Sequence, residues 1–415
     1  MTSAETMLPV AIGSILVAAK LGGDLAERLK QPAVLGELLF GVALGNLELA
    51  GLGWFHEMAS DAAVQGLAAL GAILLLFEVG LESTIDDMRK VGAQAAAVAT
   101  LGVVAPWILG VGVARLVLPD RGFEVALFIG AALTATSVGI TARVLRDLGR
   151  SQSKEARIIL GAAVIDDVMG LVILAAVTSL VRAADAGTSL SLGGIALILL
   201  KAIGFLGAAL WLGQALAPRL FGAAARLRGQ GVLLATALTF CFGLAWIASE
   251  IGLAGIVGAY AAGLVLDRVH YQRFTDRGEH QVEELLKPLT QVLVPVFFVV
   301  MGMQVELGAL VQPGIPALAA LLVAAAVLGK QACSLGALGG NVDALSIGIG
   351  MIPRGEVGLI FASIGVTLSL NGRPVVDPSL YAALVAMVLA TTVMTPPLLA
   401  WSMRRGRPGA PPDAA

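Results

Sequence analysis

The chain has 415 residues, of which 58% are hydrophobic and only 13% are charged, and its mean hydropathy is +0.90. Soluble proteins carry roughly 25% charged residues, so lipid rather than water is the expected solvent for most of this surface. No basic tract favours a nucleic-acid partner. Three histidines, two widely separated cysteines and no G-x-x-x-x-G-K-[ST] string give neither a metal cluster nor a nucleotide loop, which argues against an enzyme.

Apolar runs of roughly 20 residues, the length that crosses a bilayer as a helix, recur along the whole chain. They predict an all-α polytopic membrane protein with about thirteen transmembrane helices and short loops. In chain order the predicted spans are 7–28, 33–51, 62–82, 91–118, 123–145, 156–181, 190–218, 230–249, 252–268, 284–304, 315–339, 343–370 and 379–402. Residues 403–415 are expected to form a short cytoplasmic tail.

Basic residues in the loops and near the ends of these spans are distributed unevenly between the two sides of the predicted bundle. Most of them fall in the loops of one side, whereas Arg115, Arg121, Arg182 and Arg373 fall on the other. Because cytoplasmic loops are enriched in Lys and Arg, the distribution places the N-terminus outside and the C-terminus in the cytoplasm.

The six spans before 190–218 and the six after it form two halves, and the intervening helix inverts the second half relative to the first. Such inverted repeats are a transporter architecture. Span 123–145 is interrupted by LTATSVGIT (133–141), and its counterpart 343–370 by GMIPRGEVG (350–358). Interruptions at matching positions predict two crossed, discontinuous helices with an ion or substrate site at mid-membrane.

Two adjacent acids, Asp166 and Asp167, lie well inside span 156–181. A charge at this depth costs at least about 2.5–3.5 kcal/mol, which favours a functional role. Neighbouring helical residues point about 100° apart, so one carboxylate can face a water-filled cavity while the other faces a neighbouring helix. Lys330 lies in the middle of span 315–339, where a carboxylate partner would keep it charged.

Hydroxyl side chains are concentrated in the first interruption, at Thr134, Thr136 and Ser137. Hydroxyls and freed carbonyls in a broken helix are ligands suited to a small alkali cation. The alternative for each hydroxyl is a hydrogen bond to its own preceding turn. In the second interruption, Arg354 and Glu356 are placed to neutralise the dipole ends of the crossing helices.

With these residues in view, the chain resembles the monovalent cation/proton antiporter-2 family, and within it the NapA-type bacterial Na+/H+ antiporters. The resemblance implies an NhaA/NapA-like fold in a bacterial inner membrane. It is carried by LKQPAVLGELLFGVALG (29–45), LTATSVGITARVL (133–145), GAAVIDDVMGLVILA (161–175), FFVVMGMQVEL (297–307) and GMIPRGEVGLIFA (350–362).

The resemblance also implies a division of labour within a lipid-embedded homodimer. Residues 7–90 and 230–304 would form a dimerisation part, 190–218 a linker helix, and 91–181 with 315–402 the core ion-transport part. All of these belong to a single transmembrane antiporter domain, 1–415.

Individual roles follow from the same resemblance. Asp167 matches the carboxylate that binds Na+ and competes for H+, with Thr136 and Ser137 beside the ion. Asp166 matches the acid that pairs with Lys330, and Lys330 would carry a proton when that pair loosens.

The implied activity is electrogenic Na+/H+ antiport by alternating access, with Li+ as a further substrate and with neither ATP nor a cofactor. K+/H+ antiport by the same fold stays an alternative, because ion choice depends on cavity geometry. A passive cation channel is an alternative of another class. A channel requires a continuous polar pore, whereas the polar residues here are concentrated at one depth.

Overall fold

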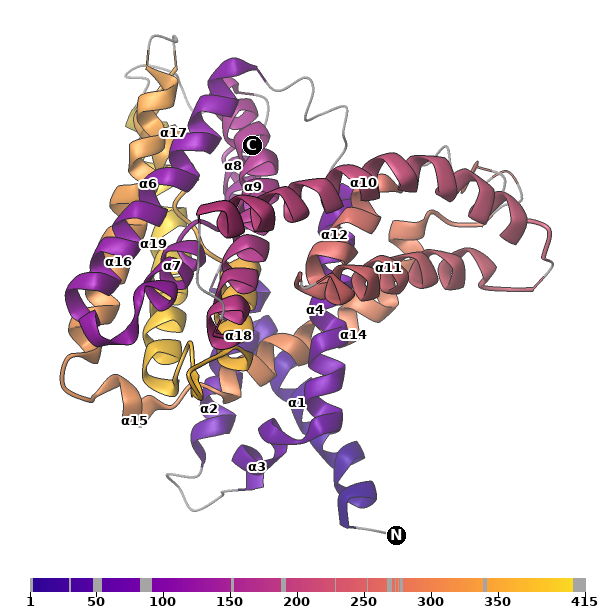
Figure 1. The fold of residues 1–415 in the computed structure, drawn as a ribbon, viewed down its shortest axis with the longest axis horizontal. Helices are drawn as coiled ribbons and strands as arrows, with labels where there is room; N and C mark the ends of the chain where they lie inside the picture. The colour runs from indigo at the N-terminus through magenta and orange to yellow at the C-terminus, as the bar shows by residue number, and fades with distance from the viewer. Residues whose placement is uncertain are drawn as a thin grey trace. The chain divides into compact units, whose positions relative to one another are not determined.

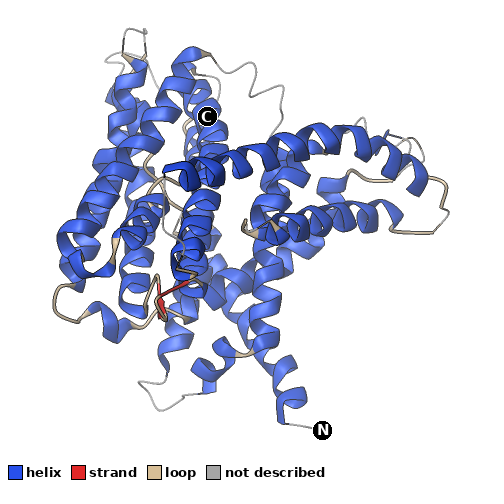
Figure 2. Ribbon diagram, in the orientation of Figure 1, coloured by secondary structure: helices blue, strands red, loops and turns tan. Residues whose placement is uncertain are grey.

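The computed structural model describes residues 3–29, 31–47, 54–82, 92–150, 153–187, 192–227, 229–251, 253–266, 271–272, 274, 276, 279–338 and 342–405. These residues are almost entirely helical, apart from one short antiparallel pair of strands (Figures 1 and 2). Most of the predicted tail, 406–415, lies outside the described residues.

The first half of the chain contains ten helices among its described residues. They are α1 (Ser3–Arg28), α2 (Ala33–Gly45), α3 (Trp54–Ser60), α4 (Ala62–Glu82), α6 (Ala93–Val117), η2 (Pro119–Arg121), α7 (Phe123–Ala132), α8 (Val138–Asp147), α9 (Lys154–Asp185) and α10 (Leu192–Ala224). The predicted span 33–51 ends as a helix at Gly45, and α3 follows as a separate short helix.

The second half continues with helices and a hairpin between the last two of them. The elements are α11 (Val232–Glu250), α12 (Gly255–Val265), α14 (Val282–Met303), α15 (Leu307–Leu310), α16 (Ile315–Gln331), η3 (Ala332–Ala337), α17 (Ala344–Gly350), α18 (Glu356–Thr367), β1 (Ser369–Leu370), β2 (Arg373–Pro374) and α19 (Pro378–Arg405). Each predicted span corresponds to one helix or to one broken pair.

Eight of the described helices are long and apolar enough to cross a membrane, and α2, α7, α12 and α18 are shorter apolar helices. The polytopic all-α fold is therefore confirmed. Both predicted interruptions are present as well, since residues 133–137 separate α7 from α8 and residues 351–355 separate α17 from α18.

By its internal contacts the chain forms two compact units. The first comprises Met1–Asp87, Leu171–Gly308 and Leu368–Pro374. Within it, α1 and α2 cross very closely. A Cβ atom built on Gly36 would lie only 1.8 Å from the carbonyl oxygen of Gly22, so only glycine fits at this point. Small residues that let helix backbones approach in this way are typical of membrane bundles.

The second unit comprises Met88–Gly170, Ala309–Thr367 and Val375–Ala415, and it contains all the predicted site residues. The predicted division into dimerisation and transport parts stays a prediction. Residues 171–181, which were expected in the transport part, belong by their contacts to the first unit. The Asp343 carboxylate starts α17 by accepting hydrogen bonds from two backbone N–H groups of its first turn.

Candidate ion-binding site

The two interrupted helices of the second unit meet at their breaks. The backbone N–H of Ser137 donates to the carbonyl of Pro353 at 2.8 Å, and the Thr141 hydroxyl donates to the carbonyl of Gly350 at 2.6 Å. A Cβ on Gly355 would lie 2.7 Å from Ser137 Oγ, so only glycine lets the two breaks approach this closely. These contacts establish the crossing that the sequence predicts.

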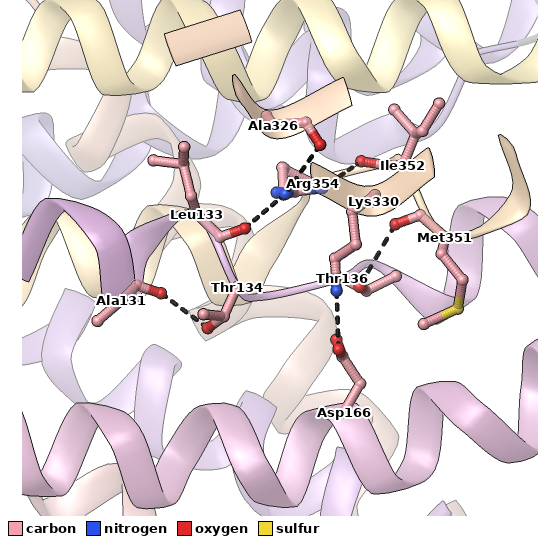
Figure 3. A network of polar contacts seen from close by, with 10 residues as sticks. All are labelled: Ala131, Leu133, Thr134, Thr136, Asp166, Ala326, Lys330, Met351, Ile352 and Arg354. Atoms are coloured by element: carbon pink, nitrogen blue, oxygen red, sulfur yellow. Dashed lines mark hydrogen bonds and ion pairs between the residues drawn. The ribbon is translucent and has the colours of Figure 1, made fainter. Parts of the chain in front are cut away.

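Thr136 contributes a weaker contact to the same crossing. Its hydroxyl lies 3.5 Å from the carbonyl of Met351 (Figure 3), and the residue is 2% exposed. Thr136 and Ser137 therefore lie where the two breaks meet, as the sequence predicts. Proline at 353 has no N–H and cannot continue α17, which explains locally why that helix stops here.

Arg354 is completely buried in this crossing, and its hydrogen bonds within the described residues are to backbone carbonyls. Its guanidinium donates to the carbonyl of Ile352 at 2.6 Å, to the carbonyl of Leu133, and to the carbonyl of Ala326 at 3.5 Å (Figure 3). Leu133 is the C-terminal cap of α7, where the helix dipole is negative. The positive charge of Arg354 thus lies at the negative end of the α7 dipole, in agreement with the placement predicted from the sequence.

Glu356, the other charge predicted at this crossing, begins α18. Its side chain lies outside the described part of the structure. The backbone position alone puts it at the N-terminal, positive end of a helix, where an acidic residue is favourable.

Asp166 and Lys330 form a buried ion pair. Lys330 Nζ donates to Asp166 Oδ1 at 2.7 Å, and both side chains have no exposed surface (Figure 3). The pair joins α9 to α16, and Arg354 interacts electrostatically with both of its members. Among the described residues, Asp166 Oδ2 accepts no hydrogen bond. In the part of the chain that the structure describes, one hydrogen bond therefore joins the pair, and an incompletely satisfied buried charge pair is costly to keep.

Asp167, the next residue of α9, is partly exposed whereas Asp166 is not. The two carboxylates therefore differ in surroundings, as their 100° separation on a helix predicts. Gly170 follows Asp166 by four residues and Asp167 by three, so it lies on the side of α9 between the two acids. A Cβ on Gly170 would lie 3.8 Å from Thr134 Oγ1, so the hydroxyl of Thr134 lies beside this side of α9.

Sequence reasoning did not identify two further groups of the site. The hydroxyl of Thr392, on α19, donates to the carbonyl of Arg354, and the Thr392 residue is 3% exposed. Gly102, on α6, lies against the Asp166–Lys330 pair. Three buried threonines within five residues of α19 were a usable signal for the first, whereas nothing in the sequence distinguishes Gly102 from the other glycines.

The family of the chain follows from its match to a protein-family model. The model described as "Sodium/hydrogen exchanger, transmembrane" matches residues 13–404. The chain belongs to the sodium/hydrogen exchanger family. The buried acids, the lysine and both helix breaks all fall within the matched range, so the family assignment covers the whole site.

Individual members of the sodium/hydrogen exchanger family are similar to this chain over nearly its full length. The high-affinity Na+/H+ antiporter NhaS3 of Synechocystis sp. is 37% identical, over 93% of this chain and 87% of the relative. The Na+/H+-K+ antiporter GerN of Bacillus cereus is 34% identical, over 94% of this chain and 95% of the relative.

The fold is also similar to that of a solved antiporter structure. The sodium proton antiporter MjNhaP1 of Methanocaldococcus jannaschii superposes with a TM-score of 0.69, covering 95% of this chain and 97% of that one, at 18% sequence identity. At this identity the likeness establishes the fold and not the substrate. It agrees with the NhaA/NapA-like fold that the sequence resemblance implies.

Proposed function

We propose that this protein is an electrogenic Na+/H+ antiporter that exports Na+ in exchange for protons by alternating access. The observation that carries the proposal is the buried Asp166–Lys330 pair, which lies next to a partly exposed second carboxylate on the same helix. In the proposed cycle Na+ and H+ compete for Asp167, and no ATP or cofactor takes part. The similarity to the Na+/H+ antiporter NhaS3 and to the Na+/H+-K+ antiporter GerN supports this assignment.

The charges of the site explain how one cation could displace another. An Na+ bound at Asp167 adds a positive charge next to the ion pair, and Lys330 then has a second cation near its partner. In a buried site such a charge weakens the hold on the ammonium proton. Lys330 is thus the proposed proton carrier, and transport of its proton in addition to the one from Asp167 makes the exchange electrogenic.

Asp167→Asn tests the ion-binding role. In proteoliposomes with an imposed pH gradient, the variant is expected to lose Na+-driven proton flux, because the amide carries no charge to bind either ion. Asp120→Asn, at an exposed position of η2, is the matched control and should transport normally. Wild-type flux in Asp167→Asn would remove this assignment.

K+/H+ exchange is a second candidate, favoured by the name of GerN, which includes K+. The same proteoliposomes, given Na+, Li+ or K+ in turn, measure which cation dissipates the pH gradient. We expect Na+ and Li+ to act at lower concentration than K+. A passive channel is distinguished by its cation flux, which would neither saturate nor move protons.

The charge carried per cycle is measurable separately. A Na+ concentration jump on a solid-supported membrane should produce a transient current in the wild type. Lys330→Ala is expected to abolish that current while some Na+/H+ exchange remains, because the lysine proton no longer takes part. An unchanged current would show that Lys330 carries no transported proton.

We further propose a homodimer in a bacterial cytoplasmic membrane, with the N-terminus outside and the C-terminus inside. The uneven distribution of basic loops supports this orientation. Fluorescence of a C-terminal fluorescent-protein fusion, together with activity of an N-terminal periplasmic reporter, tests the orientation. Mass determination of the purified protein in lipid nanodiscs tests the dimer.

A further inference from the structure

The inference concerns α6, which supplies none of the predicted ion-binding residues. This helix packs against α16 and its continuation η3. Glycines of α16 and η3 lie directly against the backbone of α6. A Cβ on Gly329 would lie 2.5 Å from Cα of Pro106, and a Cβ on Gly336 would lie 2.7 Å from the backbone N of Val98. The two backbones are therefore as close as glycine permits at both ends of the contact.

Gly102 lies midway between these contacts, four residues from Val98 and four from Pro106. A methyl group built on it would lie 2.8 Å from Cys333 Sγ, 3.6 Å from Lys330 Nζ and 3.7 Å from Asp166 Oδ1. It is thus the position at which α6 borders the buried ion pair. Ordinary van der Waals contacts begin near 3.4 Å, so only the contact with the thiol is impossible without a shift.

We infer that Gly102 is a positioning residue for proton exchange: the absence of a side chain there lets α16 and η3 lie close enough to α6 and α9 for Lys330 to reach Asp166. Cys333 transmits this constraint, because it is three residues after Lys330 on the same continuous helical segment. The inference rests on the proposed antiport function and extends it to a third helix.

Among the residues with described side chains, the charged and titratable groups that act on Lys330 come from three places in the fold. Asp166 lies on α9, Arg354 on the connection between α17 and α18, and the Cys333 thiol on η3. The carboxylate attracts the ammonium, whereas the guanidinium repels it. Since Asp166 Oδ1 is the hydrogen-bond acceptor of Lys330 Nζ within the described residues, lengthening this one contact changes how readily the ammonium releases its proton.

The size of the effect follows from the geometry. Relieving the clash between an alanine methyl and Cys333 Sγ requires a shift from 2.8 Å to about 3.4 Å. If the ion pair lengthens equally, from 2.7 Å to about 3.3 Å, its Coulomb attraction falls enough to move a titration by about 0.8 pH unit at an effective dielectric constant of 20. A less tightly held ammonium releases its proton at lower pH.

The test measures Na+-dependent proton flux against pH in proteoliposomes that contain the full-length chain. We expect Gly102→Ala to move the pH of half-maximal activity down by about 0.8 unit. Cys333→Ala removes the clashing sulfur, so the double variant Gly102→Ala/Cys333→Ala should return close to the wild-type profile. A double variant as shifted as Gly102→Ala would overturn the proposed route through Cys333.

Gly336→Ala is the matched steric control, because its clash of 2.7 Å lies in the same helix interface but against Val98. It should lower thermal stability and leave the pH profile unchanged. An equal pH shift in Gly336→Ala would overturn the inference, since any loosening of the interface would then suffice. An unshifted profile in Gly102→Ala would also overturn it.

The outcomes remain separable from those of the proposed function. Absence of Na+-driven flux in the wild type contradicts antiport itself, whereas wild-type flux with an unshifted Gly102→Ala contradicts only the role of Gly102. If Gly102→Ala yields no folded protein, Cys333→Val crowds the same contact from the opposite helix. That variant should shift the profile in the same direction, and a wild-type profile in it would refute the inference.

Discussion

Replacing Lys330 by methionine tests the energetics of the buried pair. At 2.7 Å, two unit charges attract by about 6 kcal/mol at an effective dielectric constant of 20. Removing one member of a buried pair leaves the other uncompensated and costs about 3–5 kcal/mol. We therefore expect Lys330→Met to destabilise the protein by about this amount. Arg28→Met, which breaks the exposed pair of Arg28 with Asp24, should cost less than about 1 kcal/mol.

The second half of this prediction is a recovery. In the double variant Asp166→Asn/Lys330→Met no buried charge of the pair remains, so most of the lost stability should return. A double-mutant cycle isolates the interaction of the two residues from the effects of each substitution. We expect a coupling energy of about 3 kcal/mol, because the uncompensated charge dominates each single variant.

The measurement is unfolding in mixed micelles, followed for the wild type, both single variants and the double variant at one pH. Titration with denaturing detergent gives the four free energies on a common scale. The electrostatic reasoning fails if the two single effects simply add, that is, if the coupling energy is below about 0.5 kcal/mol. It also fails if Lys330→Met is no less stable than Arg28→Met.

Three further predictions concern the helices around the site. Thr392→Val should cost about 1–3 kcal/mol, because the buried carbonyl of Arg354 loses its donor, whereas Thr367→Val at an exposed position should cost little; thermal unfolding measures both. Gly36→Ala should prevent α1 from packing on α2 and abolish expression of folded protein, whereas Gly13→Ala, with open space around it, should be tolerated. Asp343→Ala should destabilise α17 by about 1 kcal/mol in the same unfolding assay, and asparagine should retain most of that capping.

Much of the fold was predictable because its signals are local. Apolar runs of bilayer length identify the helices, and the interruptions at 133–141 and 350–358 carry their own breakers, such as Pro353. The start of α9, by contrast, is two residues earlier than predicted, and α10 continues six residues past its predicted end. Amphipathic helix ends beyond the hydrocarbon region have no strong hydropathy signal.

The site was predictable only in part. The cost of a charge in lipid singled out Asp166, Asp167 and Lys330, and the resemblance assigned the pairing of Asp166 with Lys330 that the structure contains. Thr392 and Gly102 were not predicted as site residues, because their roles depend on contacts with helices that are distant in the sequence. A glycine that touches an ion pair and a glycine in open space are identical in sequence.

The bonds of Arg354 have a consequence for how the chain is made. Leu133 is synthesised 221 residues before the guanidinium that binds its carbonyl. In hydrocarbon an unsatisfied backbone carbonyl costs several kcal/mol. The break between α7 and α8 therefore enters the membrane without its partner, and we expect the nascent first half to hold it in a different conformation or against water. Arg354 can satisfy the Leu133 carbonyl only after the second half of the chain has been inserted, so we expect the crossing to form late in membrane assembly.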